Sequence, residues 1–253
     1  MKKMILAALS ALTLGLTANA QDLSFILQGG YQGAKLTSFD AQELASGFRI
    51  GAALDWEFLD LGLAELSLQP GVNFSQKGTN LIGTLQNGQS IFTLANNPSI
   101  ENAINAAMKM NYIDIPVLLN ARFDVPLLGN VFVQAGPYVA FGIGSSTNIS
   151  TGNETVDNAI GGIADLINGG GKQNFDVFKD NIMEKLDYGL QFGGGIEWNR
   201  ILLSAGYQLG LKNLSKAENT VQENLNIIGE GIKNSLATGT KNSSFYVSVG
   251  FRF

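Results

Sequence analysis

The C-terminal stretch reads Ser244-Phe-Tyr-Val-Ser-Val-Gly-Phe-Arg-Phe253. Every second residue from Phe245 to Phe253 is apolar, and most of the residues between them are small, polar or charged. This period of two is that of a β-strand with one wholly apolar face. A strand of a water-soluble sheet can carry the same pattern, so the rest of the chain has to decide between the two environments.

The same alternation recurs in seven other segments. In each of them apolar residues share one face, while glycine, polar and charged residues occupy the other. The eight predicted strands cover 23–35, 48–58, 64–75, 112–123, 131–143, 186–198, 201–212 and 244–253. Ile26 breaks the first pattern, and Pro70 predicts a bulge because proline cannot donate a ladder hydrogen bond. An even number of such strands predicts an all-β fold, an eight-stranded antiparallel transmembrane β-barrel.

The connections between these strands alternate in length. Those near 59–62, 124–130 and 199–200 are short, and those near 36–46, 78–108, 145–185 and 214–242 are longer. Short periplasmic turns and long outer loops are typical of outer-membrane barrels, so both termini are predicted on the periplasmic side. The aromatic girdle at that interface is predicted to comprise Trp56, Phe58, Phe123, Trp198 and Phe253.

The C-terminal aromatic residue has a second predicted role. Phe253 is expected to be the signal that the barrel-assembly machinery reads, at a seam where the last strand pairs with the strand that starts at Leu23. The predicted partners of this protein are therefore that machinery and the lipid bilayer of the outer membrane.

The long loops contain apolar residues at helical spacing. Ser99 is a candidate N-cap for a helix with Ile100, Ala103, Ile104, Ala107 and Met108 on one face. Further stripes at 156–167, 175–182 and 221–236 predict partly helical outer loops. Two interpretations remain open: these helices pack on one another as a cap over the barrel mouth, or they form a surface that binds a protein partner.

The N-terminal residues indicate export. Lys2 and Lys3 precede an apolar run from Met4 to Leu16, and Ala18-Asn19-Ala20 supplies small residues at a cleavage site. A retained membrane helix would need about 20 apolar residues, which is longer than this run. We therefore expect residues 1–20 to be a signal peptide cleaved after Ala20, and residues 21–253 to be an outer-membrane barrel domain.

Composition excludes several functions. The full chain has a formal charge of −5, which becomes −7 once two lysines leave with the signal peptide, so a nucleic-acid partner is not expected. The chain contains no cysteine and no histidine. Histidine is the general base of many hydrolases and the commonest ligand of catalytic zinc, so none of that chemistry is available. We predict that the protein is not an enzyme and uses no metal or other cofactor.

Charged residues on the inward face of the predicted strands group by depth. Glu57, Glu65, Glu197, Arg122 and Arg252 fall toward the periplasmic end, and Arg49, Asp114, Asp187, Lys77 and Lys212 toward the outer end. Asp114 and Asp187 could be paired carboxylates for acid/base catalysis. Both signs occur at both depths, however, and an unpaired buried charge is costly. We therefore favour a network of structural ion pairs that plugs the lumen.

Five motifs resemble a known family. They are Asn111-Tyr-Ile-Asp-Ile-Pro-Val-Leu-Leu119, Val133-Gln-Ala-Gly-Pro-Tyr138, Leu186-Asp-Tyr-Gly-Leu-Gln-Phe-Gly-Gly-Gly-Ile-Glu197, Gly206-Tyr-Gln-Leu-Gly-Leu-Lys-Asn-Leu214 and Val249-Gly-Phe-Arg-Phe253. In this order they are similar to the PorT-like outer membrane β-barrel family of Bacteroidetes. The resemblance implies an eight-stranded barrel, in a family whose members mostly have no assigned activity. The PorT protein itself is tied to a protein secretion apparatus.

These observations lead to one functional hypothesis and its alternatives. The leading hypothesis is a non-enzymatic barrel of the cell outer membrane with a structural or surface-interaction role. The alternatives are a narrow channel or transport accessory for small or hydrophobic solutes, and, from the resemblance, a PorT-type component of protein secretion.

Overall fold

The computed structural model describes residues 23–37, 44–86, 89–91, 103–126, 129–150, 177–178, 183–216 and 239–253. Within these residues the regular structure consists of β-strands. They are β1 (Leu23–Leu36), β2 (Ala45–Asp60), β3 (Ala64–Gln86), β4 (Gln89–Ile91), β5 (Ala103–Val125), β6 (Gly129–Ser150), β7 (Leu186–Trp198), β8 (Ile201–Gly210) and β9 (Asn242–Arg252). None of the described residues forms a helix long and apolar enough to cross a membrane.

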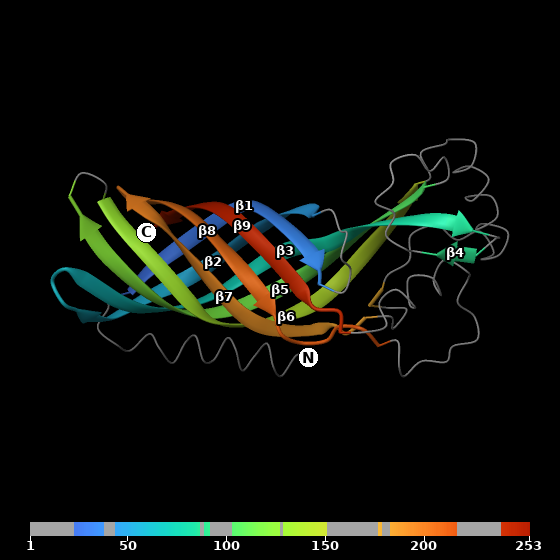
Figure 1. Cartoon of the computed structure of the whole chain (residues 1–253). Coiled ribbons are helices and arrows are strands. Elements are labelled where there is room, and N and C mark those ends of the chain that lie inside the picture. Colours follow the sequence, from blue (N-terminus) through green and yellow to red (C-terminus); the bar gives the residue numbers. More distant parts are fainter. Residues whose placement is uncertain are drawn as a thin grey trace.

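Eight of the strands close into an antiparallel barrel (Figure 1). The sheet runs β2-β1-β9-β8-β7-β6-β5-β3, and a further pairing of β2 with β3 closes the circle. The seam lies between β1 and β9, where the Phe253 backbone N–H donates to the Phe25 carbonyl at 2.8 Å. β4 pairs only with the end of β3 and lies outside the circle. The predicted eight-stranded antiparallel barrel is therefore confirmed.

The two ends of the barrel differ in their connections. At one end, here called the turn end, β2 joins β3 through three residues and β7 joins β8 through Asn199 and Arg200. Both of these residues have positive φ, 48° and 74°, as a two-residue hairpin turn that matches the twist of its strands requires. The chain passes between β1 and β2, β6 and β7, and β8 and β9 at the other end, here called the loop end.

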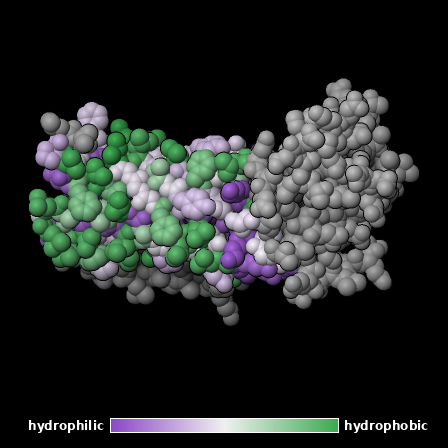
Figure 2. Space-filling model, viewed as in Figure 1, coloured by the Kyte–Doolittle hydropathy of each residue, from purple (hydrophilic) through white to green (hydrophobic). Residues whose placement is uncertain are grey.

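Side chains alternate between a lipid-facing and a lumen-facing side as the sequence predicts. Large apolar residues such as Ile50, Val133 and Val249 are exposed on the outside, whereas their strand neighbours are buried or half-buried. Figure 2 shows the resulting apolar band on one face of the barrel wall. The exposed aromatics Trp56, Phe58, Phe123, Trp198 and Phe253 lie toward the turn end, where the girdle was expected.

Three strands are longer than predicted and extend past the loop end of their neighbours (Figure 1). β3 and β5 stay paired as far as Thr84 and Ala103, and β5 stays paired with β6 as far as Ser150. The predicted helix beginning near Ser99 is wrong over 103–108, because these residues pair with β3 throughout and with β6 from Asn105 onward. The helices predicted over 156–167 and 221–236 lie outside the described residues, as does most of the segment 175–182.

Irregularities in the ladder occur at different places from the one predicted. Pro70 does not shift the register, since the β2–β3 and β3–β5 pairings keep the same alignment on both sides of it. The register shifts instead between Glu57 and Leu59, and between Asn111 and Tyr112. A bulge requires an extra residue in one strand. Pro70 removes a hydrogen-bond donor from the ladder but inserts no residue, so no bulge forms there.

Candidate functional site: the barrel lumen

Two arginines and three carboxylates meet in the lumen at the turn end. Arg122 on β5 donates to Asp55 on β2 and to Glu65 on β3, both at 2.6 Å. Arg252 on β9 donates to Glu197 on β7 at 2.8 Å and also to Asp55. Arg122 Nε lies 3.8 Å from Glu197 Oε2. We call these five residues the turn-end cluster.

The turn-end cluster joins five strands that lie around the whole circumference. Asp55 is at its centre, because one carboxylate oxygen accepts from both arginines and its side chain is 1% exposed. Charge-assisted bonds of this kind are about twice as strong as neutral ones, and each arginine has a carboxylate on either side. Each contact joins neighbouring strands or strands separated by one other, and together the contacts connect the barrel wall around the lumen at this depth.

Asp55 was absent from the residues singled out in the sequence, although strand parity places it on the same face as Arg49. Glu57, which was singled out, is half-buried next to the β2–β3 bulge and pairs in register with Ser67. The bulge shifts the pairing of the last residues of β2. The position of Glu57 along its strand therefore does not by itself show whether its side chain reaches the turn-end cluster.

A layer of amides surrounds the Tyr246 hydroxyl in the middle of the lumen. Tyr246 accepts from Gln191 at 3.0 Å and from Gln134 at 3.2 Å. Gln191 in turn accepts from Gln208 at 2.9 Å. The ring fits because Gly206 has no side chain: a Cβ there would lie 2.4 Å from the Tyr246 hydroxyl. We call Tyr246 and these three glutamines the amide layer.

Arg49 contributes to the amide layer rather than to an ion pair. Its guanidinium lies 4.3 Å from the centre of the Tyr246 ring and donates to Gln191 at 3.4 Å. The structure gives Arg49 no carboxylate partner among the described residues. A cation–π contact with the ring face partly replaces the water that burial removes.

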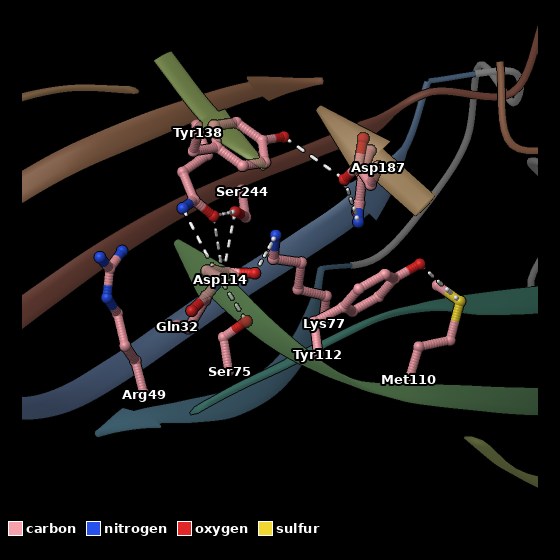
Figure 3. A network of polar contacts seen from close by, with 12 residues as sticks. Gln32, Arg49, Ser75, Lys77, Met110, Tyr112, Asp114, Tyr138, Asp187 and Ser244 are labelled. Atoms are coloured by element: carbon pink, nitrogen blue, oxygen red, sulfur yellow. Dashed lines mark hydrogen bonds and ion pairs between the residues drawn. The ribbon is translucent and has the colours of Figure 1, made fainter. Parts of the chain in front are cut away.

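A buried ion pair lies on the loop-end side of the amide layer (Figure 3). Lys77 Nζ is 3.1 Å from Asp114 Oδ1, and both side chains are 1% exposed or less. Asp114 also accepts from Ser75 at 2.9 Å and from Gln208 at 3.3 Å. Lys77 lies 4.9 Å from the centre of the Tyr138 ring.

The second inward carboxylate, Asp187, is held separately. It accepts from the Tyr138 hydroxyl and from Asn242, each at 3.4 Å. Tyr138 therefore contacts both Lys77 and Asp187, and Figure 3 shows the two carboxylates pointing into different parts of the network. Their arrangement is that of separately neutralised or hydrogen-bonded groups and not of a shared catalytic pair.

Lys212 does not join the lumen network. It lies beyond the end of β8, 3.6 Å from Glu184, and Lys216 is also 3.6 Å from the same carboxylate. β8 ends at Gly210, so the alternation that predicted an inward Lys212 no longer applies at this position.

Apolar side chains close the lumen at the loop end. Leu36, Met108, Met110, Val177, Phe178, Met183 and Leu214 are all buried. The Phe178 ring meets Tyr112 edge-on with 5.5 Å between ring centroids. The same ring covers Gly142, where a Cβ would lie only 2.4 Å from it. We call these residues the apolar cap.

A small cavity separates the amide layer from the turn-end cluster. It has a volume of about 10 Å³, roughly the space of one water molecule, and Arg252 and Gln134 line part of it. Ile26, Ala53, Phe132 and Leu202 form an apolar cluster on its wall, which explains why Ile26 departs from the alternation of its strand.

The described residues contain no group of three or more acidic, histidine or cysteine side chains that could hold a metal ion. Side chains thus fill the lumen in successive layers. From the turn end to the loop end these are the turn-end cluster, the amide layer, the Lys77–Asp114 pair and the apolar cap, with a water-sized cavity between the first two.

The Tyr246 hydroxyl gives a direct test of the amide layer. Tyr246→Phe is expected to lower the free energy of unfolding by about 1–3 kcal/mol, because two amide donors lose a buried acceptor. Tyr188→Phe is the matched control, since Tyr188 faces lipid and is exposed; its effect should stay within about 0.5 kcal/mol. Urea titration in detergent micelles, followed by tryptophan fluorescence, measures both. Equal shifts would contradict the assigned role of the hydroxyl.

The closed antiparallel circle, the apolar outer band and the filled polar interior define a transmembrane β-barrel of the outer-membrane class. Residues 12–216 match the family described as outer membrane protein beta-barrel domain. The chain belongs to this family, and its location is the outer membrane.

The individual proteins that resemble this chain are distant from it in sequence. No curated protein matches the chain significantly. Solved structures with a similar fold include the Neisserial surface protein A, at 12% identity and a TM-score of 0.40, covering 92% of this chain and 96% of that one. Others are Ail of Yersinia pestis (13%, 0.35, 92% and 99%) and the outer membrane protease OmpT of Escherichia coli (10%, 0.36, 93% and 97%). No activity is transferred from proteins this distant.

Proposed function

We propose that this protein is a non-enzymatic outer-membrane barrel with a structural or surface-interaction role. The observation that supports it most is the filled lumen, in which side chains from strands that are not neighbours in the sheet meet at several depths. Asp55 alone links β2 to β5 and β9, and Gln191 and Gln134 reach Tyr246 from two further strands. A barrel whose interior is occupied by its own side chains serves through its outer surface and its connections.

The same contacts argue against catalysis in the lumen. Asp114 and Asp187 are both 0% exposed, and Asp114 already holds Lys77, Ser75 and Gln208. A general acid or base must reach a substrate atom within hydrogen-bond distance. These carboxylates instead face partners that the barrel itself supplies, and the chain has no histidine to take their place.

Several finer assignments belong to the proposal. Residues 1–20 act as a signal peptide cleaved after Ala20, and Phe253 is the residue that the barrel-assembly machinery reads. If the role is surface interaction, the partner binds the long connections at the loop end. The PorT resemblance adds participation in protein secretion as a further candidate, and an unchanged secreted proteome after deletion of the gene would remove it.

Planar-bilayer recording tests the proposal against the narrow-channel alternative. The purified full-length barrel is expected to insert without stable single-channel steps, because side chains that contact one another occupy the lumen at several depths. Insertion is verified independently by heat-dependent mobility on electrophoresis gels. A heat-unfolded aliquot of the same preparation controls for contaminating pores. Reproducible unitary steps that disappear in that aliquot would overturn the proposal in favour of a channel.

A further inference from the structure

The charged residues that the structure describes at the loop end, outside the lumen, are almost all lysines. Among the described residues they are Lys35, Lys109, Lys185, Lys212, Lys216 and Lys241, with Glu184 as the one acid. This excess of cations runs against the chain as a whole, whose formal charge is −5. The exposed charges of the described turn end have the opposite tendency, with Asp60 and Asp124 against Arg200.

Two of these lysines, here called the lysine pair, lie diagonally across the seam. Lys35 on β1 is in register with Ser243 on β9. Lys241 lies two residues before Ser243, just ahead of the first residue of β9, so the alternation of the strand places both lysines on the outward side. The Thr37 backbone N–H donates to the Lys241 carbonyl at 2.8 Å, and the Thr37 hydroxyl is 3.2 Å from both the N–H and the carbonyl of Lys241. Both lysines are exposed. Within the described part of the chain neither forms an ion pair.

Aromatic residues lie directly below the lysine pair on the outer wall. Tyr31 and Phe245 are neighbours, with ring centroids 5.8 Å apart, and the Tyr207 hydroxyl contacts the Ser243 hydroxyl. The Tyr31 hydroxyl is bonded to Ser46 at 3.0 Å. Tyrosines that pair an apolar ring with a hydroxyl at the barrel end mark the level where acyl chains give way to headgroups. Figure 2 shows hydrophilic residues at this end of the apolar band.

The position of the lysine pair therefore fixes its surroundings. It lies at the level of the headgroups, faces away from the lumen and carries two positive charges on the two sides of the seam. The bonds to Thr37 keep the backbone of Lys241 beside β1, so the fold itself holds the two residues near each other. A compact ammonium group suits a phosphate oxygen, which it binds as a point charge.

We propose that Lys35 and Lys241 bind the phosphate group of an anionic lipid in the outer leaflet. The inference goes beyond the proposed function, since it assigns a lipid partner whether or not the loops meet a protein. Charge complementarity and continuity with the lipid-facing band select this occupant. The acidic residues of the chain's own connections, such as Asp40, Glu43 and Glu218, are the competing occupants that the experiment has to exclude.

Native mass spectrometry of the full-length barrel in detergent tests the proposal. The protein is titrated with equal mixtures of phosphatidylglycerol and phosphatidylcholine, and the ratio of the two retained lipids is measured. Each lysine near an anionic headgroup contributes about a fivefold preference. The double variant Lys35→Gln/Lys241→Gln is therefore expected to lose most of the preference of the wild type for phosphatidylglycerol.

Two further variants and one additive make the result specific. Arg200→Asn removes one positive charge at the turn end, where positive φ suits asparagine, and should leave the lipid ratio unchanged. Lys35→Arg/Lys241→Arg keeps the charge and should restore the preference. Millimolar inorganic phosphate should not abolish it, because the barrel surface adds the acyl chains to the contact.

Three outcomes would overturn the assignment. An unchanged lipid ratio in the double glutamine variant would leave the lysines without a lipid partner. Competition by inorganic phosphate at millimolar concentration would make the ligand a free anion. The third outcome combines two results: the wild type shows no lipid preference, and the glutamine variant unfolds at a lower urea concentration in phosphatidylcholine alone. It would show that the lysines pair with the chain's own acidic residues.

Discussion

Asp55→Asn is expected to lower the free energy of unfolding by about 3–5 kcal/mol, the cost of removing one partner from a buried ion pair. Asp55 is the carboxylate that both Arg122 and Arg252 share. Without its charge, two guanidinium groups whose side chains are only 11% and 12% exposed depend on Glu65 and Glu197 alone. Urea titration in micelles, with Trp56 and Trp198 as fluorescent reporters, measures the change.

The matched control for this substitution is Asp124→Asn, which removes the same charge from an exposed position at the turn end. Its effect should stay within about 0.5 kcal/mol. A double variant, Asp55→Asn with Arg252→Met, removes one charge of each sign and should be more stable than the sum of the single effects predicts. Additive effects would show that the residues of the turn-end cluster act independently.

Val247→Arg is expected to impair folding into vesicles, at a cost of about 2–4 kcal/mol if the side chain lies near the bilayer midplane. Val247 faces outward on β9 between Tyr31 and Ala205, and 45% of it is exposed to the region that lipid occupies. The folded fraction after dilution from urea, read from heat-dependent mobility on gels, measures this effect.

Leu63→Arg is the control, because Leu63 lies in the turn between β2 and β3 and is 84% exposed. Arginine near the interface should cost only about 0–1 kcal/mol. Ser248→Arg, one residue further along β9, is expected to be harmful too: Ser248 is buried against Gly30, where even a Cβ would lie 2.8 Å from its hydroxyl. Equal folding of the Val247 and Leu63 variants would contradict the assigned faces of β9.

The sequence predicts the barrel wall well, because an apolar period of two indicates both that a segment is a strand and which of its side chains face lipid. Ala103, Ile104, Ala107 and Met108 show where this fails. Their spacing fits one face of a helix, and alanine favours helices. In the folded chain all four residues pair with β3, and Ala107 and Met108 also pair with β6, so the ladder hydrogen bonds override the local preference.

The candidate site was predictable only in part. Parity places Glu65 and Arg122 on the inward face, and the β3–β5 pairing sets them directly opposite each other. Arg252 reaches Asp55 past β1, the strand that lies between β9 and β2, so this contact depends on the registers of two strand pairs and on the tilt of the strands, which no single segment encodes. Arg49 shows a second limit. Its partners are an amide and an aromatic ring, so matching residues of opposite charge does not identify them.

The seam between β1 and β9 has a consequence for the order of events in assembly. Gln32 and Ser244, which are hydrogen-bonded across it, are 212 positions apart, so this pairing is among the most non-local in the chain. Before it forms, two strand edges carry backbone groups without partners, and each such group costs several kcal/mol in hydrocarbon. A partly assembled sheet therefore gains little from entering the bilayer, which makes closure of the seam and stable insertion a single cooperative step.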